Sequence, residues 1–200
     1  MRTNITGAIL AGGRSSRMGR DKALLDLDGV PFIERVAHAL KSVFDEVLVI
    51  SDHAGQYAFL NLPIFVDGYK NCGPLAGIHS ALINATKDAI FVASCDIPFL
   101  TPSFIREVIA HDGHCDVTLV FGSNSLEPLC GLYRKTCLPV VERQLRKRKY
   151  AVRACLQNLQ TTILTLPPKA HSNLIHPLTN INTPNDYEHC QRTARHKRHL

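Results

Sequence analysis

Several features are scarce in this sequence, and each absence excludes a class of protein. The 200 residues contain no Trp, and aromatic residues make up only 6%, so the aromatic stacking platforms of RNA-binding modules are missing. No apolar run approaches the ~20 residues that a membrane-spanning helix needs. The N-terminal apolar run stops at Gly12 without a cleavage site, so we expect no signal peptide.

The cysteines also lack a recognisable pattern. There are seven, at Cys72, Cys95, Cys115, Cys130, Cys137, Cys155 and Cys190. No pair has the two-residue spacing that is typical of zinc sites and thioredoxin-type motifs. We therefore expect reduced thiols and a cytoplasmic location.

The remaining composition is that of an ordinary globular protein, with 45% hydrophobic and 20% charged residues. The formal net charge is +6, and four of these charges belong to Arg192, Arg195, Lys197 and Arg198. We expect a single domain over residues 1–190 and a disordered basic tail over residues 191–200. Because the tail has no interleaved aromatic residues, we expect neither a nucleic-acid partner nor a membrane contact.

Short apolar runs separated by amphipathic segments predict a sheet covered by helices. We expect buried strands at residues 5–11, 46–50, 64–66, 89–94 and 117–121. Helix starts are indicated at Pro31, Pro74, Thr101-Pro102 and Thr183-Pro184. In the less regular second half, we expect strands at 127–135 and 161–167 and helices at 138–149 and 152–159.

This alternation of strands and helices indicates the fold class. The connections are too long for hairpins, which implies right-handed βαβ crossovers between parallel strands. We therefore predict an α/β fold of the three-layer Rossmann-like type, with a mainly parallel sheet and helices on both faces. In such folds ligands bind at the edge formed by the carboxyl ends of the strands.

A basic, glycine-rich loop directly follows the first predicted strand. It contains Gly12, Gly13, Arg14, Arg17, Arg20 and Lys22. Glycines let backbone N–H groups approach a polyphosphate, and the cations would balance the charge of a triphosphate. The spacing matches neither GxxxxGK[ST] nor GxGxxG, so two better-known phosphate loops are excluded. The alternative is a basic surface turn.

Two aspartates follow strands that should end at the same sheet edge. Mg²⁺ takes one or two carboxylates plus phosphate oxygens, so Asp96 beside a triphosphate could bind it. The alternative is that Asp96 only caps the following turn. Asp67 precedes Gly73-Pro74, which open a helix whose N-terminus offers N–H donors to a phosphate or nucleotide. For Asp67, a turn residue and a ligand contact are both open.

Several segments together resemble the molybdenum cofactor guanylyltransferases, a family within a nucleotidyltransferase superfamily. LAGGRSSRMGRDKALL at 10–25 is similar to the superfamily signature. The other similar segments are GPLAG at 73–77, SCDIPF at 94–99, PLCGLYR at 128–134 and NINTPND at 180–186. The resemblance implies the nucleotidyltransferase fold. It also implies a Mg²⁺-dependent enzyme that converts GTP and molybdopterin, usually carrying molybdenum, into molybdopterin guanine dinucleotide and pyrophosphate.

The resemblance also implies roles for individual residues. The expected GTP-binding residues are Leu10, Ala11, Gly12, Gly13, Lys22, Asp67 and Asp96. Asp96 would also bind Mg²⁺ and be catalytic, together with Lys22 and Arg17, whose charges would stabilise the leaving pyrophosphate. Asn180 and Asn182 would help to form the acceptor pocket. Where the family is expected to carry a polar residue such as Asn near the nucleoside, this chain has Ser51-Asp52, and either could serve.

Basic residues between 143 and 153 suggest a further acceptor contact, with Arg153 as the first candidate; the alternative is a solvated basic face. The resemblance suggests GTP and molybdopterin as substrates and transient contact with molybdenum-insertion and cofactor-accepting proteins. Competing functions are a cytidylyltransferase for the same pterin, a sugar-phosphate nucleotidyltransferase, and a non-catalytic nucleotide- or RNA-binding module. The last of these would not need Asp96.

Overall fold

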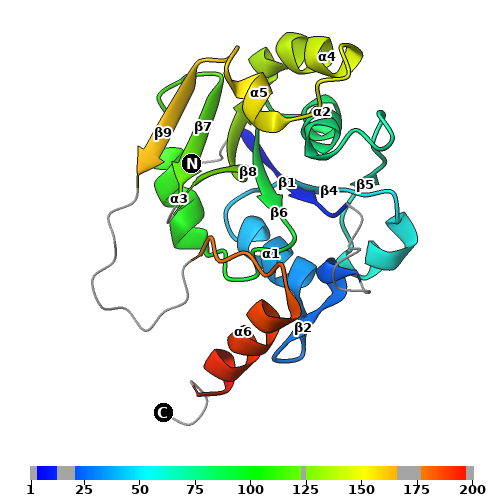
Figure 1. The fold of residues 1–200 in the computed structure, drawn as a ribbon, viewed down its shortest axis with the longest axis vertical. Helices are drawn as coiled ribbons and strands as arrows, with labels where there is room; N and C mark the ends of the chain where they lie inside the picture. Colours follow the sequence, from blue (N-terminus) through cyan, green and yellow to red (C-terminus); the bar gives the residue numbers. More distant parts are fainter. Residues whose placement is uncertain (1–3, 13–20, 123–124, 166–176, 197–200) are drawn as a thin grey trace.

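The computed structural model describes residues 4–12, 21–122, 125–165 and 177–196, with side chains to residue 191 except that of residue 189. Within these ranges a seven-stranded sheet forms the centre of the molecule (Figure 1). Its strands, in spatial order, are β5 (Ile64–Phe65), β4 (Val47–Ile50), β1 (Ile5–Leu10), β6 (Ala89–Ser94), β8 (Leu126–Arg134), β7 (Val117–Phe121) and β9 (Thr161–Thr165).

The sheet is mainly parallel, as the sequence predicted. Strands β5, β4, β1 and β6 run in one direction, and β7 and β9 pair in parallel with each other. Strand β8 is antiparallel to both of its neighbours, β6 and β7. The connection from β7 to β8 is short, which is possible because antiparallel neighbours need no crossover helix.

Helices cover both faces of the sheet and complete the three layers (Figure 1). The helices α1 (Phe32–Lys41) and α3 (Pro102–Ala110) pack on one face. The other face carries α2 (Pro74–Asn84), α4 (Leu138–Arg146) and α5 (Val152–Leu156). Alternate residues of the central strands β1, β4 and β6 enter opposite clusters, so both faces are buried there and these strands are mostly apolar. The predicted α/β fold class is confirmed.

A smaller apolar cluster joins the last helix to the first half of the chain. Helix α6 (Pro184–His196) packs on the hairpin formed by β2 (Asp26–Leu27) and β3 (Val30–Pro31). Leu27, Phe32, Ile181 and Cys190 are buried together there. Short 3-10 helices are η1 (Lys22–Leu24), η2 (Ala54–Leu60) and η3 (Lys135–Cys137).

The helix starts follow the capping rules that the sequence indicated. Thr101 Oγ1 accepts a hydrogen bond of 3.3 Å from the Phe104 backbone N–H at the start of α3. At the start of α6, Asp186 Oδ2 accepts from the Thr183 N–H at 2.8 Å, and the Asp186 N–H donates to Thr183 Oγ1 at 3.2 Å. This reciprocal arrangement satisfies donors that a helix N-terminus leaves free.

Helix α6 continues to His196, so the boundary expected at residue 190 falls inside a helix. The helix that starts behind the Thr183–Asp186 cap meets no glycine or proline before His196. Residues 197–200 lie outside the described part of the chain.

Among the described residues, no helix has the length and apolar character needed to cross a bilayer.

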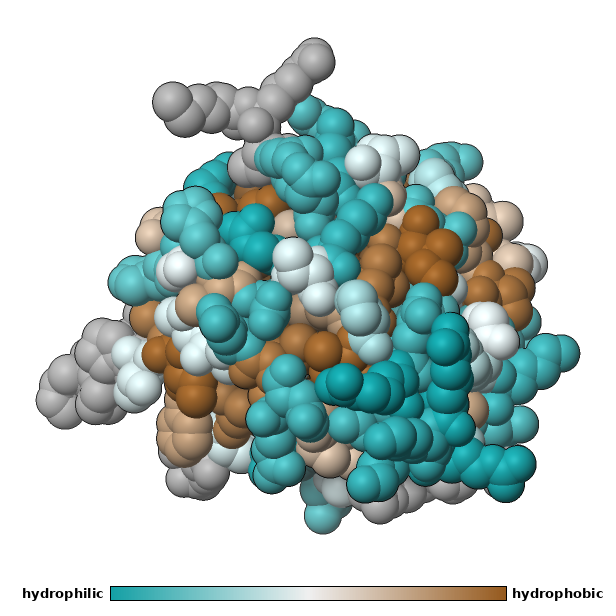
Figure 2. Space-filling model, turned by 90° about the horizontal axis from the view of Figure 1, so that it is seen from above, coloured by the Kyte–Doolittle hydropathy of each residue, from teal (hydrophilic) through white to brown (hydrophobic). Residues whose placement is uncertain are grey.

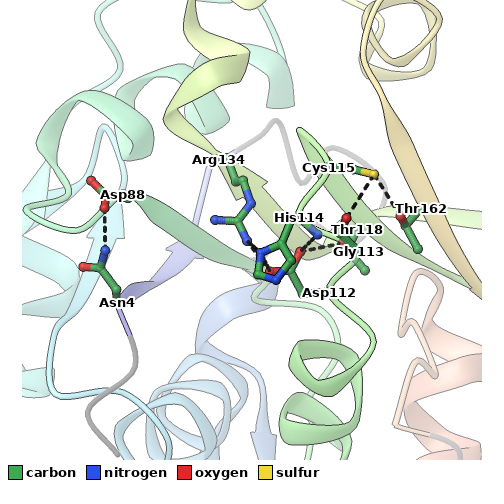
Figure 3. A network of polar contacts seen from close by, with 9 residues as sticks. All are labelled: Asn4, Asp88, Asp112, Gly113, His114, Cys115, Thr118, Arg134 and Thr162. Carbon is green, nitrogen blue, oxygen red and sulfur yellow. Dashed lines mark hydrogen bonds and ion pairs between the residues drawn. The ribbon is translucent and has the colours of Figure 1, made fainter.

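At the amino-terminal edge of the parallel strands, polar contacts tie the chain together (Figure 3). Arg134, at the end of β8, forms an ion pair with Asp112, and Asp112 Oδ1 also accepts from the Thr118 hydroxyl at 3.3 Å. Cys115 lies against Thr162 of the neighbouring strand at 3.3 Å. The Asp112 carboxylate at this edge thus has protein partners.

Candidate nucleotide site

The carboxyl ends of the parallel strands bring three chain segments together. Leu10 at the end of β1 pairs with Ile50 of β4 and Ser94 of β6. The Ala11 N–H donates to the Ile50 carbonyl at 2.9 Å, and the Cys95 N–H donates to the Leu10 carbonyl at 3.3 Å. The first loop, Ser51-Asp52 and Cys95-Asp96 therefore leave the sheet side by side, as expected for a ligand site in this fold class.

A cavity of about 670 Å³ opens at this edge, within the usual size range for small-molecule sites. Its walls come from the ends of β1, β4 and β6, the start of α2, and β8. The lining residues are Leu10, Gly12, Ile50, Ser51, Asp52, His53, Asp67, Asn71, Gly73, Pro74, Gly77, Ser94 and Leu129. Three of the expected GTP-binding residues, Leu10, Gly12 and Asp67, thus line one cavity.

The start of the basic loop faces open space. A Cβ atom built on Gly12 would meet no described atom within 4 Å. Ala11 is buried behind the cavity and supports its wall through the hydrogen bond to Ile50. Gly13 was also expected to contact the nucleotide, and Arg17 to stabilise the leaving pyrophosphate, but both lie outside the described residues.

Asp67 places an unsatisfied carboxylate oxygen at the cavity wall. Its Oδ1 atom is buried and has no hydrogen-bond partner among the described residues. Burial and the nearby charge of Asp52 raise the pKa of Asp67 to about 6. A buried acceptor without a partner is costly, so a ligand that brings N–H or O–H donors would bind favourably here.

The N-terminus of α2 forms the adjacent part of the wall. Gly73 precedes the helix with φ 69°, a left-handed conformation that glycine adopts without strain. Gly77 lies in the first turns, where an added Cβ would stand 3.3 Å from Leu10 Cδ2 and 3.8 Å from Asp67 Oδ1. Glycine therefore lets the helix approach β1 closely. The free N–H groups and the dipole of this helix end favour an anionic ligand.

Asp96 follows β6 at the same edge, although it is not part of the cavity lining. Its Oδ1 atom is buried and unpartnered among the described residues, while its backbone carbonyl accepts from the Ile181 N–H at 3.1 Å. A buried oxygen that lacks a donor suits a hard cation, and Mg²⁺ often takes one protein carboxylate plus phosphate oxygens and waters. No group of three or more His, Cys, Asp or Glu side chains in the described ranges could bind a metal alone.

The structure brings Lys22 and Asn182 into direct contact. Lys22 Nζ donates to Asn182 Oδ1 at 2.9 Å, although the two residues are 160 positions apart. Asn180 Nδ2 lies 3.4 Å from Glu127 Oε2, at the start of β8. The expected phosphate-binding lysine and the expected acceptor-binding asparagines therefore share one region beside Asp96.

Arg153 lies on α5 and is exposed. Its Nη2 atom donates to the Leu126 carbonyl at 3.2 Å, which places it at the start of β8 and outside the cavity lining. The surface that carries α4 and α5 is largely hydrophilic, with apolar patches between the polar side chains (Figure 2). This location is compatible with both the acceptor contact and the solvated basic face.

Some cavity residues were not among the expected site residues. His53 and Asn71 line the cavity, and Ser51 and Asp52 do so together, so the structure does not choose between those two. Their common signal is that they follow β4 or β5 on loops at the carboxyl edge of the sheet. Glu127 had no such signal, because its contact with Asn180 joins distant parts of the chain.

Comparisons with known proteins agree on one family. Residues 7–162 match the model of the MobA-like NTP transferase domain. A probable molybdenum cofactor guanylyltransferase from Carboxydothermus hydrogenoformans is 39% identical over 188 residues, covering 92% of this chain and 94% of the relative. A molybdenum cofactor guanylyltransferase from Desulfosudis oleivorans is 34% identical over 190 residues, covering 94% of each chain.

A solved structure shows the same fold. The molybdopterin-guanine dinucleotide biosynthesis protein A from Archaeoglobus fulgidus superposes with a TM-score of 0.79 at 24% sequence identity. The match covers 98% of this chain and 100% of that one. The arrangement of helices and strands is therefore shared over nearly the entire chain.

Proposed function

The chain belongs to the MobA-like NTP transferase family, and on this basis we propose that it transfers GMP from GTP to molybdenum-loaded molybdopterin and releases pyrophosphate. The observation that carries the proposal is the open carboxyl edge of the sheet. There the cavity, the helix α2 N-terminus, Lys22 and the unpartnered oxygens of Asp67 and Asp96 lie together. This set provides acceptors for a nucleoside, donors for phosphates and a ligand for a cation.

Guanine suits the nucleoside end of the cavity. Its Watson–Crick edge presents adjacent N1–H and N2–H donors, which two carboxylates can accept. Asp52 and Asp67 both line the cavity, and Asp67 Oδ1 is buried without a donor among the described residues. Cytosine presents an acceptor next to its single amino group, and the acceptor would face a carboxylate unfavourably.

The residues present fit Mg²⁺, and Asp96 would bind it. A bound Mg²⁺ would neutralise charge on the phosphate oxygens. Lys22 would bind phosphate oxygens through its ammonium group and stabilise negative charge on the departing pyrophosphate. We also assign Arg17 to this task, from its position in the basic loop.

The chain's task in the reaction is positioning. The acceptor's terminal phosphate is already ionised at neutral pH, so its oxygen can attack the α-phosphorus in line without a general base. A new phosphorus–oxygen bond forms, and the bond to the β-phosphate oxygen breaks, which releases pyrophosphate. Asn180, Asn182 and Arg153 would orient the acceptor beside Asp96.

Further assignments follow from the same proposal. The acceptor region around Asn182 would also face proteins that deliver molybdenum or receive the product. All seven cysteines are free thiols, which supports work in the reducing cytoplasm.

The test is pyrophosphate release by the purified full chain with molybdenum-loaded molybdopterin and Mg²⁺. GTP, CTP and ATP are compared at equal concentration. We expect release with GTP and much slower release with the other two. Release with CTP alone would move the chain to the cytidylyltransferases, and release with none would overturn the acceptor assignment. Omitting Mg²⁺ and adding a chelator tests the metal requirement.

A further inference from the structure

A buried phenol connects the wall of the cavity to the segment that carries Lys22. Tyr57, on η2, is 1% exposed, and its hydroxyl donates to Asp21 Oδ2 at 2.5 Å. The Ser51 side chain, which lines the cavity, lies next to the phenol oxygen. Burial and the Asp21 carboxylate raise the pKa of Tyr57 well above its ordinary value, so the hydroxyl keeps its proton.

Asp21 uses both carboxylate oxygens to fix the backbone around Lys22. Its Oδ1 atom accepts from the Ala23 N–H at 3.0 Å and so caps η1, while its Oδ2 atom accepts from Tyr57. Lys22 lies in the sequence between Asp21 and Ala23, which the first of these bonds joins. The backbone of Lys22 therefore depends on a carboxylate that Tyr57 holds in place.

The far end of the Lys22 side chain is also held. Its ammonium donates to Asn182 Oδ1, and Asp186 Oδ2 accepts from the Asn182 and Thr183 N–H groups at 2.9 and 2.8 Å. Lysine is long and flexible, so its alignment with a phosphate depends on such contacts. Tyr57 acts through Asp21 on the backbone of Lys22, so Tyr57 itself does not need to contact a substrate.

We propose that Tyr57 is a positioning residue, which acts through Asp21 to align Lys22 with the triphosphate and ties that alignment to the cavity wall at Ser51. The inference rests on the proposed function only in that Lys22 binds the phosphates of a nucleoside triphosphate. Removing the Tyr57 hydroxyl leaves Asp21 Oδ2 without its donor. η1 then loses its fixed position, and the affinity for GTP should fall about tenfold, the scale of one hydrogen bond to a charged group.

The experiment measures GTP affinity by calorimetry on the full chain with Mg²⁺ and no acceptor. Tyr57→Phe keeps the buried ring and removes only the hydroxyl. The matched control is Tyr133→Phe, which removes another buried hydroxyl that donates to a backbone carbonyl, that of Pro128, at 2.6 Å. Both variants are also made in a Lys22→Ala background, which gives a double-mutant cycle.

We expect Tyr57→Phe to weaken GTP binding about tenfold in the wild-type background and less than twofold in the Lys22→Ala background. Tyr133→Phe should lower thermal stability to a similar degree without changing GTP affinity. Equal losses in both backgrounds would show a general structural role and overturn the proposal. So would unchanged affinity in Tyr57→Phe.

A second variant keeps the test decisive if Tyr57→Phe does not fold. Asp21→Asn retains an oxygen for the Ala23 N–H and removes the charge that Tyr57 binds, so its loss of affinity should also disappear without Lys22. Because the measurement needs no pterin, a failed acceptor assignment leaves this test intact. If the wild-type chain binds no GTP, the proposed function fails first.

Discussion

The raised pKa of Asp67 leads to a prediction about the balance between stability and binding. The carboxyl group has a pKa of about 6 in the folded chain, against an ordinary value near 4. The folded state therefore binds this proton more tightly than the unfolded state. The stabilisation of the folded state by the protonated Asp67 is fully present below the ordinary pKa. It is lost as the pH rises through about 6.

At 1.36 kcal/mol per pKa unit, the difference between the folded and ordinary pKa values corresponds to at most about 3 kcal/mol of stability. The cavity is open to water, which screens the charge, so we discount the cost of the ionised form to roughly 1–2 kcal/mol at pH 7.5. Asp67→Asn removes this charge. It should raise the Tm by roughly 3–6 °C at pH 7.5 for a chain of this size, and by much less at pH 5.

The assay is thermal unfolding of the wild type and Asp67→Asn between pH 5 and pH 8, with GTP affinity measured on the same samples. Wild-type affinity should fall as the pH drops below about 6, because protonation removes an acceptor for the base. The variant should bind GTP weakly throughout. The control variant Asp52→Asn removes the nearby charge, which is the second cause of the raised Asp67 pKa. The fall in GTP affinity should therefore occur at a lower pH in this variant than in the wild type. An unchanged or lower Tm in Asp67→Asn at pH 7.5 would refute the reasoning.

Four further predictions concern single residues. Asp96→Ala should abolish pyrophosphate release, and Lys22→Ala should lower it by ~10²-fold or more, both measured by steady-state kinetics; near wild-type rates in either variant would contradict the assigned roles. Arg153→Ala should raise the acceptor KM while leaving GTP affinity unchanged, and a wild-type KM would favour the solvated basic face. Gly131→Ala should lower the free energy of unfolding by about 1–3 kcal/mol in a denaturant titration, because its Cβ would stand 2.5 Å from the Thr118 carbonyl oxygen.

Local patterns were sufficient for the framework of the fold. The expected strands and helix starts are present because apolar runs, Pro74 and the Thr101 cap act on neighbouring residues. Asp67 and Asp96 could be proposed for the same reason, since each comes shortly after the end of a strand. The hairpin β2–β3 was missed, although Asp28-Gly29, with φ of 58° and 81°, is a common two-residue hairpin turn.

Contacts between distant segments could not be predicted in this way. The hydrogen bond between Lys22 and Asn182 spans 160 positions, and that between Tyr57 and Asp21 spans 36. Neither pair has a periodicity or a spacing that marks it. The direction of β8 is a similar case, because an apolar run indicates a strand and says nothing about which neighbour it joins.

The carboxylates at the two edges of the sheet differ in whether protein atoms satisfy them. At the amino-terminal edge, Asp112 is paired with Arg134 and bonded to Thr118. At the carboxyl edge, Asp67 and Asp96 each keep a buried oxygen without a partner among the described residues. Leaving such atoms unsatisfied lowers the stability of the folded chain. A ligand with N–H donors and a divalent cation would satisfy them and stabilise the folded chain on binding. The carboxyl edge therefore offers unsatisfied carboxylate oxygens to a ligand.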